Sequence, residues 1–354
     1  MSLVVELQIT ALAFGGEGIA RHAGQVVFIP FTAPGDRVRA KITETHKSFL
    51  RAEPLEFLER GPGRETPPCP YFGSCGGCQY QHLTYDLELR WKEQQLRDAL
   101  VRIGKIPEPP IDPMVRSPEP YGYRNRITLH LAEDKIGFRD LKGRAVVDIK
   151  ECLIAEPEVN EALWKLRQHP PPRERWTLRS SGVEGHAFYQ ANRFLLETLR
   201  QAVADNTETA PVLIEGYAGV GFFTEVLAPR FQRVFMIEND TRAAATAQAK
   251  NLLNTTVLAG RCEDWLSGAW RQSRAEEGAV CLVDPPREGL EAVMAAQLAE
   301  LPFRQIVYLS CNPATLARDL NRLSSRWSVK KLVPFDLFPR TAHIECLAIL
   351  QPAS

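Results

Sequence analysis

The sequence predicts an α/β protein with a doubly wound parallel sheet at its carboxyl end, an OB-like β-barrel at its amino end and a small central domain. Three observations lead to this fold class. From about residue 191 onward, short apolar runs alternate with helical stretches, which is typical of a doubly wound sheet. The first 60 residues contain strand-like runs between Gly/Pro turns, as small barrels do. Between these parts lie a cysteine-glycine loop and a long polar helical pattern.

Chain length and composition set the expected domain boundaries. The 354 residues exceed the roughly 250 to 300 at which a single core stops growing, so we expect several domains. The linker ERGPGRETPPCP separates the first domain from the second. We therefore assign residues 1–60 to the barrel, 61–190 to the central domain and 191–354 to the doubly wound sheet. The helical pattern at 86–104 is expected to pack on the last domain.

The charge of the chain does not identify its binding partner, but its hydropathy argues against insertion into a membrane. Lys and Arg number 43 and Asp and Glu number 43, so net charge does not indicate nucleic-acid binding. A slight excess of basic residues between 90 and 145 is explained equally well by a solvated face. The sequence contains no run of 18 apolar residues, and its first residues lack a basic region ahead of an apolar core, so we expect neither a membrane span nor a secretory signal. We expect a monomeric cytoplasmic protein with no membrane partner.

The barrel is expected from two strand-like runs, QVVFIP and DRVRAKITE, which alternate with the turn segments FGGEGIARHAG and TAPGD. Glycine and proline end strands, and several short strands at close spacing favour a small curled sheet. This pattern indicates an OB-like shape for residues 1–60.

Three cysteines, Cys69, Cys75 and Cys78, lie on one glycine-rich loop, CPYFGSCGGCQYQH. Glycines allow such a loop to fold closely around a centre, and a tetrahedral metal or a cubane cluster needs a fourth thiolate. Cys152 is the expected donor, because the other four cysteines fall in the last domain. The spacing leaves zinc and an iron-sulfur cluster open, and also an incidental group of free thiols.

The segment YGYRNRITLHL brings two aromatic and two basic residues together: Tyr121, Tyr123, Arg124 and Arg126. Aromatic rings that stack on bases and arginines that contact phosphates are typical of RNA-binding surfaces. Ordinary surface or core-edge residues show the same pattern. The segment therefore favours RNA as partner only in combination with other features.

The carboxyl-terminal domain carries a cofactor pattern. In LIEGYAGVGFFT, Gly219 and Gly221 follow a strand and precede a helix, where a tight turn lets backbone approach a nucleotide-like ligand. About 20 residues further on, Glu238 ends the next strand and can accept hydrogen bonds from ribose hydroxyls. Nicotinamide enzymes and S-adenosylmethionine enzymes share these features. The short G-x-G and the following LVDPPREG, with Asp284 at a strand end, favour the methyl donor. The alternative is a glycine turn made only for packing.

The stretch QIVYLSCNPATL reads as a buried strand that ends in Cys311 and is followed by a helix beginning near Pro313. Chemistry in open α/β sheets lies at carboxyl strand ends, so Cys311 is a candidate functional thiol. A cysteine that only fills the core is the alternative.

Together these segments resemble the RNA uracil-5 methyltransferases, and among them the iron-sulfur 23S ribosomal RNA enzymes with an amino-terminal TRAM domain. The resemblance covers nearly the whole chain and rests, in family order, on GEGIARHAGQVVFIPFTAPGDRV, CGGCQYQH, YRNRI, FYQANRFL, DPPREG, SCNPATLARDL and FPRTAHIECLAIL. Two departures, Gly216 and Ala218, leave the glycine turn intact. The resemblance implies methylation of carbon 5 of a uridine in 23S ribosomal RNA, with transfer RNA as the alternative substrate.

The resemblance also implies roles for single residues. It implies a 4Fe-4S cluster on Cys69, Cys75, Cys78 and Cys152. S-adenosylmethionine contacts would come from Gln190, Tyr217, Glu238 and Asp284, beside the turn at Gly219 and Gly221. Cys311 corresponds to the nucleophile and Glu345 to the base.

Methylation of uracil needs these residue types, because carbon 5 is a poor nucleophile until a thiolate adds to carbon 6. A helix beginning near Pro313 is expected to favour the anionic form of Cys311. Glu345 would remove the proton from carbon 5, with His343 as a candidate for positioning it; alone, it would read as an edge-strand carboxylate. A methyltransferase acting on an exocyclic amine and a noncatalytic iron-sulfur RNA-binding protein are the remaining alternatives.

Overall fold

The computed structural model describes residues 3–132, 134–181, 191–252, 254–273 and 278–353. The chain divides into two compact units. The first comprises Met1–Gln95, Glu119–Ser181 and Phe338–His343, and the second comprises Leu96–Pro118, Gly182–Leu337 and Ile344–Ser354. The division falls inside helix α1 (Tyr85–Arg102), and Leu96 and Leu100 from its second half belong to the core of the second unit.

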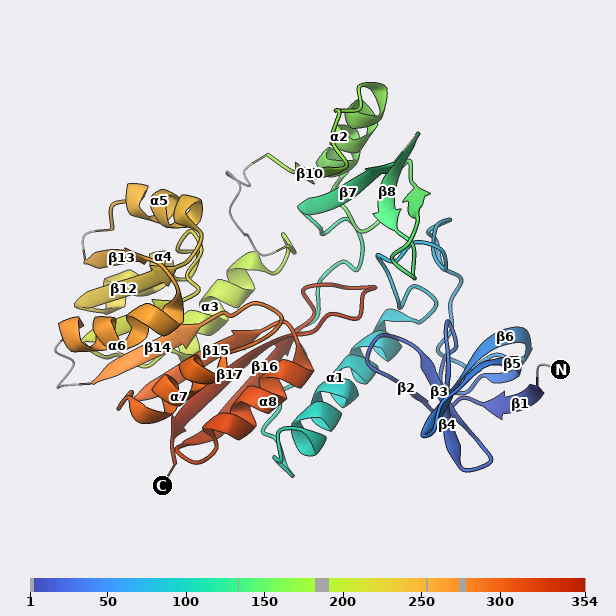
Figure 1. The fold of residues 1–354 in the computed structure, drawn as a ribbon, viewed down its shortest axis with the longest axis horizontal. Helices are drawn as coiled ribbons and strands as arrows, with labels where there is room; N and C mark the ends of the chain where they lie inside the picture. The colour runs from blue at the N-terminus through green and yellow to red at the C-terminus, as the bar shows by residue number, and fades with distance from the viewer. Residues whose placement is uncertain (1–2, 133, 182–190, 253, 274–277, 354) are drawn as a thin grey trace. The chain divides into compact units, whose positions relative to one another are not determined.

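The first unit begins with a six-stranded sheet (Figure 1). Its strands are β1 (Val4–Gln8), β2 (Ala11–Leu12), β3 (Gly18–His22), β4 (Gln25–Ile29), β5 (Arg37–Thr45) and β6 (Phe49–Glu59), in the order β1-β5-β6-β4-β3-β2. Residues of these strands, among them Leu7, Val27, Val38 and Leu50, form one buried core. Bulges between β5 and β6 bend the sheet around this core.

The predicted barrel is therefore only partly confirmed. Among the described residues, the hydrogen-bonded ladder ends at β1 on one side and at the two-residue β2 on the other, and the sheet does not close. The short β2 leaves too few backbone groups to join the far edge. The strand-like runs predicted strands correctly but held no signal for closure, which depends on pairing between distant edges.

The rest of the first unit contains a four-stranded antiparallel sheet in the order β10-β7-β8-β9. Its strands are β7 (Arg126–Ala132), β8 (Lys135–Arg139), β9 (Val146–Asp148) and β10 (Arg175–Arg179), and helix α2 (Pro157–Gln168) contacts β10. Side chains alternate along the first part of β7: Ile127 and Leu129 are buried, while the residues on either side of them are partly exposed. One face of this sheet is therefore apolar and the other polar.

The second unit is a seven-stranded sheet in the order β13-β12-β11-β14-β15-β17-β16. The five parallel strands are β11 (Val212–Gly216), β12 (Arg233–Glu238), β13 (Thr255–Ala259), β14 (Ala279–Val283) and β15 (Gln305–Ser310). β16 (Trp327–Phe335) and β17 (Glu345–Pro352) complete it, and β17 lies antiparallel between β15 and β16 (Figure 1). The doubly wound parallel sheet is confirmed, with an antiparallel pair added at one side.

Helices α3 (Leu196–Asn206), α4 (Thr224–Leu227), α5 (Thr241–Ala249), α6 (Cys262–Ser273), α7 (Ala292–Glu300) and α8 (Pro313–Leu323) connect the strands, with a 3-10 turn η1 at Ala228–Arg230. α7 packs against both α6 and α8, and α3 packs against α4. The strand order reverses between β11 and β14, so the carboxyl ends of these strands flank the crevice where open α/β sheets bind ligands. None of the helices in the described part of the chain is long and apolar enough to cross a membrane.

Candidate active site

Three ionisable groups gather at the carboxyl-end edge of the central strands: Asp284 after β14, Cys311 after β15 and Glu345 at the start of β17. The register between β15 and β17 pairs Ser310 with Cys346, so the next position in this register brings Cys311 opposite Glu345. Residues opposite each other on antiparallel strands project to the same face. The sheet therefore brings a thiol and a carboxyl group together.

Glu345 lies in the interior of the sheet and not at its edge, because β16 covers the far side of β17 and pairs Phe335 with Glu345. The residue is 2% exposed, and its Oε1 atom has no hydrogen-bond partner among the described residues. Interpretation as an edge-strand carboxylate is therefore wrong. A buried carboxyl oxygen without a partner costs about 1 to 3 kcal/mol, which is typical of functional sites rather than of cores.

Burial and mutual repulsion raise the pKa values of these groups. Burial raises the pKa of Cys311 to about 12, with Glu345 and Asp284 adding to the shift and Arg287 opposing it. Burial raises the pKa of Asp284 to about 7. The pKa of Glu345 lies well above its usual range because of burial first and the charge of Asp284 second. In the free protein at neutral pH, Cys311 is therefore a thiol. The carboxyl groups of Asp284 and Glu345 are at least partly protonated, whereas exposed carboxyl groups are ionised at this pH.

The expectation that helix α8 favours the thiolate of Cys311 is set against a pKa that rises overall. The helix does begin directly after the cysteine, with Asn312 as its N-cap and Pro313 at its first position. Burial and the two neighbouring carboxyl groups nevertheless raise the pKa of Cys311. A helix end typically contributes only about 0.3 to 1 kcal/mol at exposed sites.

Two residues that sequence reasoning did not select fix the loop after Asp284. The Asn312 side-chain amide donates to the Arg287 carbonyl oxygen at 3.2 Å, while its oxygen accepts from the backbone N–H of Ala314 at 3.0 Å. The buried Asp319 carboxylate accepts from the backbone N–H of Leu290 at 2.8 Å. Asn before a helix is a sequence signal for a cap. Asp319 carries no such signal, because its burial depends on the packing of α8.

The glycine turn lies where the sequence predicted it, between β11 and α4. Tyr217 and Gly219 have φ values of 59° and 57°, a left-handed conformation that the turn requires. A side chain at Gly219 would meet no atom within 4 Å, so this backbone borders open space. Tyr217 is held by its hydroxyl group, which donates to Glu263 at 2.9 Å. Gly221 has a φ of 83° and packs closely against Met236.

Glu238 is fixed at the ends of β11 and β12 by backbone hydrogen bonds. Its Oε2 atom accepts from the N–H of Gly219 at 2.7 Å, and its Oε1 atom accepts from the N–H of Asp240 at 2.7 Å. Each carboxylate oxygen retains a further lone pair for a ligand hydroxyl group. The sequence predicted this acid, and the structure adds that the glycine turn itself orients it.

A small cavity of about 30 Å³ lies between the glycine turn and Asp284. Ligand pockets are usually about 300 Å³ or larger, so this cavity alone would not enclose a nucleoside. Its lining is Glu215, Tyr217, Ala218, Gly219, Val220, Phe222, Phe223 and Asp284. Gln190, the remaining predicted contact, lies outside the described residues.

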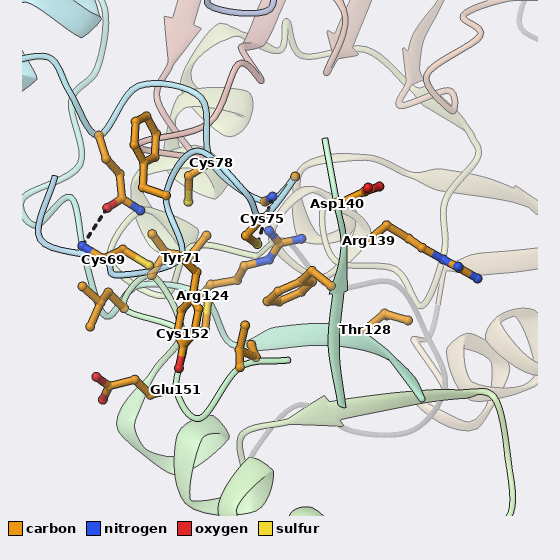
Figure 2. Close-up of a pocket in the computed structure, with 18 of the residues that line it drawn as sticks. Cys69, Tyr71, Cys75, Cys78, Arg124, Thr128, Arg139, Asp140, Glu151 and Cys152 are labelled. Carbon is orange, nitrogen blue, oxygen red and sulfur yellow. Dashed lines mark hydrogen bonds between the residues drawn. The ribbon is translucent and has the colours of Figure 1, made fainter. Parts of the chain in front are cut away.

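The four predicted cysteine ligands line one cavity of about 370 Å³ in the first unit (Figure 2). Cys69, Cys75 and Cys78 come from the glycine-rich loop, and Cys152 comes from the segment before α2. In the described part of the chain, however, no three His, Cys, Asp or Glu side chains are placed to hold a metal ion. The four thiols therefore line one cavity without being placed to bind a single metal ion.

Two amides, also missed from the sequence, fix the cysteine segments. The Gln81 side-chain oxygen accepts from the backbone N–H of Cys69 at 3.3 Å. Asn160 of α2 accepts from the N–H of Cys152 at 2.8 Å and donates to its carbonyl oxygen at 3.1 Å. Burial raises the pKa of Cys78 to about 12 and that of Cys152 to about 11, so both are thiols at neutral pH without a metal.

The predicted aromatic and basic cluster is divided by the fold. Tyr123 is fully buried and donates to the Pro339 carbonyl oxygen at 2.9 Å, so it is not available to stack on a base. Tyr121 is half-buried beneath a guanidinium group. Arg124 and Arg126 line the cysteine cavity. His343 lines the same cavity, and its ring meets that of Phe338 edge-on with the centroids 5.6 Å apart.

Comparison with known proteins relates this arrangement to one family. A model of the tRNA (uracil-5-)-methyltransferase family matches residues 182–352, and a TRAM domain model matches residues 4–55. An uncharacterized RNA methyltransferase from Bdellovibrio bacteriovorus is 30% identical over 373 residues, which cover 98% of this chain and 95% of that protein. The chain belongs to the RNA (uracil-5-)-methyltransferase family. The predicted enzyme class and the TRAM domain are thereby confirmed.

Two further proteins are similar to this chain over nearly its whole length. An uncharacterized RNA methyltransferase from Aquifex aeolicus is 28% identical over 417 residues, which cover 98% of both chains. Among solved structures, the Pyrococcus abyssi tRNA (uracil-54, C5)-methyltransferase in complex with S-adenosyl-L-homocysteine is 24% identical, with a TM-score of 0.73 over 99% of this chain and 100% of that chain. At this identity the likeness shows a common fold.

Proposed function

We propose that this methyltransferase transfers a methyl group from S-adenosylmethionine to carbon 5 of a uridine in 23S ribosomal RNA, through a covalent adduct of Cys311. The placement of Cys311 opposite Glu345 carries the proposal. A methyltransferase acting on an exocyclic amine would need no thiol, and a noncatalytic RNA-binding protein would need neither group. The resemblance of the cysteine loop to the ribosomal RNA enzymes favours ribosomal over transfer RNA.

The residues at the glycine turn fit a nucleoside methyl donor. The backbone at Gly219 is open to a ligand, and Glu238 has lone pairs for ribose hydroxyl groups. Asp284 lines the same small cavity as the turn and joins β14 to β11 through its N–H, which donates to the Gly216 carbonyl oxygen at 3.4 Å. Tyr217 and Gln190 would complete the contacts. S-adenosylmethionine supplies the electrophilic methyl group when bound.

The reaction divides between Cys311 and Glu345. The Cys311 thiol gives its proton to solvent, and the thiolate forms a bond to carbon 6, which moves an electron pair to the ring as an enolate. Carbon 5 then attacks the methyl group, whose bond to the sulfonium sulfur breaks with the electron pair going to that sulfur, so that S-adenosylhomocysteine leaves. The Glu345 carboxylate takes the hydrogen from carbon 5 as a proton, the double bond re-forms, and the bond between carbon 6 and sulfur breaks with the electrons returning to sulfur.

The shared electrostatics order these steps. Because Cys311 and the two carboxyl groups repel one another as anions, all three are not ionised together in the free site. When the Cys311 thiolate adds to carbon 6, its negative charge passes to the ring, and methyl transfer then removes that charge. Relative to the thiolate state, the carboxylate form of Glu345 is therefore favoured after methyl transfer, when a base is needed.

A 4Fe-4S cluster is the second part of the proposal. Four thiols lining one cavity are the donor set of such a cluster, and the volume of about 370 Å³ between them has room for more than one ion. Cys69, Cys75 and Cys78 would hold the cluster together with Cys152. Bound there, it would cross-link the glycine-rich loop to the segment before α2.

The function is tested by supplying purified protein and labelled S-adenosylmethionine with unmodified 23S ribosomal RNA or unmodified transfer RNA, and by mapping 5-methyluridine. We expect one labelled uridine in 23S ribosomal RNA. Label in transfer RNA alone would correct the substrate and leave the chemistry intact. Label at a site other than carbon 5, or no transfer to either RNA, would refute the proposal.

A further inference from the structure

The polar face of the four-stranded sheet carries an unusual arrangement of basic residues. β7 and β10 pair in a register that puts Arg126 opposite Arg179, Thr128 opposite Thr177 and His130 opposite Arg175. These six side chains share one face, since alternate residues of a strand project to the same side. The apolar residues between them, including Ile127, Leu129 and Leu178, are buried on the other face.

Like charges directly opposite each other destabilise an antiparallel pair, and this ladder contains one such pair, Arg126 and Arg179. In the second basic pair, His130 faces Arg175 and becomes charged only when it is protonated. Burial and the nearby charges of Arg179 and Arg124 lower the pKa of Arg126. Burial together with Arg139 and Arg175 lowers the pKa of His130. The basic groups of this face therefore act on one another electrostatically.

Two details of this face are compatible with an anionic ligand. The Nε atom of Arg179 is buried and has no hydrogen-bond partner among the described residues. Arg175 and Arg139 are exposed at the rim of the same face. Between the basic pairs, the Thr128 and Thr177 hydroxyl groups lie 3.0 Å apart and offer further polar contacts.

The face extends to the cysteine cavity. Thr128 and His130 of β7 and Arg139 of β8 border that cavity, and Figure 2 shows Thr128 and Arg139 on neighbouring strands beside it. Its lining also contains two carboxylates, Asp140 and Glu151. Asp140 is occupied locally, because it accepts from the backbone N–H of Arg144 at 2.7 Å. The basic residues of the β7–β10 ladder outnumber these carboxylates.

We propose that the β7–β10 face, defined by Arg126, Thr128, His130, Arg175, Thr177 and Arg179, binds the sugar-phosphate backbone of the substrate RNA. This inference rests on the proposed function for the identity of the RNA. A chain of phosphates matches a row of basic groups in charge, and its binding would relieve their mutual repulsion. The threonine hydroxyl groups suit ribose or phosphate oxygens. Contacts of this kind position the RNA without reading its sequence.

The test uses Arg175→Ala combined with Arg179→Ala, both of which lie outside the cysteine cavity lining. Affinity for the substrate RNA is measured as a function of salt concentration. Each phosphate contact to single-stranded RNA contributes about 0.7 to the slope of log affinity against log salt, so we expect the slope to fall by about 1.4. Binding at low salt should weaken by about tenfold. Calorimetric binding of S-adenosylmethionine should not change.

Two control variants separate charge from folding. Lys165→Ala removes an exposed basic residue from α2 rather than from the ladder, and should leave the slope at the wild-type value. The combination Arg175→Lys, Arg179→Lys keeps the charges and should restore most of the slope. A wild-type slope in the double alanine variant, or an equal loss with Lys165→Ala, overturns the inference.

The same measurements distinguish this inference from the proposed function. If the wild-type protein methylates RNA but the double alanine variant binds it with an unchanged slope, the face is not an RNA site and the enzymatic proposal stands. If the wild-type protein methylates no RNA but the variant still loses slope, the face binds RNA and the enzymatic proposal fails. If the face binds inorganic phosphate as tightly as it binds each phosphate group of RNA, and RNA does not displace the inorganic phosphate, an RNA backbone site is refuted.

Discussion

Cys311 and Glu345 occupy facing positions where β15 and β17 meet, one residue beyond the pair Ser310 and Cys346. A helix and a long strand separate the two residues in the sequence, so their proximity results from the insertion of β17 between β15 and β16. The antiparallel strand thus contributes a carboxyl group to a sheet edge that otherwise carries the ends of parallel strands. Testable predictions follow from the charges and contacts around this pair, at the glycine turn and in the cysteine cavity.

The first prediction concerns the reactivity of Cys311 in the free protein. Because its pKa is raised to about 12, its thiolate fraction should increase about tenfold for each pH unit between pH 7 and pH 9. Labelling by iodoacetamide, located by mass spectrometry, should increase in proportion. Cys311→Ala provides the control for labelling at other cysteines. A labelling rate that reaches a plateau below pH 9 would show that the helix end stabilises the thiolate after all.

The second prediction concerns stability and Asp284. Its pKa rises from 3.8 to about 7 in the folded protein, so the folded state retains a proton that the unfolded state loses. The free energy of unfolding should fall as the pH rises from 4 to 7, by about 2 to 3 kcal/mol after allowance for solvent screening. Asp284→Asn removes the contribution of Asp284 to this dependence, while the raised pKa of Glu345 continues to contribute. The variant should therefore be more stable than wild type at pH 8, with the difference disappearing near pH 4.

Chemical denaturation of both proteins at pH 4, 6 and 8 measures this difference. The matched control is Asp264→Asn, which changes an exposed carboxylate on α6 and should keep the pH profile of the wild type. Equal pH profiles for wild type and Asp284→Asn would contradict the account.

The third prediction concerns the methyl donor. Glu238→Ala should weaken binding of S-adenosylmethionine by about 1 to 3 kcal/mol, because charge-assisted hydrogen bonds to the ribose are lost. Titration calorimetry gives the affinity directly. Glu225→Ala, which removes a carboxylate of the same domain paired with Lys250 and Arg200, is the matched control. Unchanged affinity in Glu238→Ala would exclude Glu238 from the donor site.

The fourth prediction concerns the cysteine cavity. Protein purified without oxygen should be brown and contain about four iron atoms per chain. Cys152→Ser should lose the colour and most of the iron, whereas Cys281→Ser, a buried cysteine of β14, should retain both. Iron content by elemental analysis and the visible absorption spectrum provide the measurement. One zinc ion per chain and no iron would contradict the expected cluster.

The sequence was sufficient to predict the parts of this protein that depend on local pattern. Buried runs ending in Glu238, Asp284 and Cys311 predicted parallel strands with polar residues at their carboxyl ends, and the structure places them so. The glycine turn and the cysteine loop were visible because each needs unusual residues at close spacing. Their roles in the reaction remain proposals.

What the sequence did not predict depends on contacts between distant segments. The sequence alone suggested that Glu345 lies on an edge strand, because the residue pattern of β17 does not reveal that β16 pairs with that strand. Tyr123 read as a stacking residue, although its hydroxyl group is directed to Pro339, 216 residues away. The high pKa of Cys311 also has no sequence signal, since it arises from burial and from carboxyl groups brought together by three strands.

The most direct test of the account is to trap the covalent adduct. With substrate RNA and S-adenosylmethionine labelled in its methyl group, Glu345→Gln should add the thiol and transfer the methyl group but should not release the RNA. A labelled protein-RNA complex that survives a denaturing gel should therefore accumulate. Cys311→Ala, alone or combined with Glu345→Gln, should form none. Normal turnover by Glu345→Gln, or a complex that persists without Cys311, would contradict the assignment of nucleophile and base.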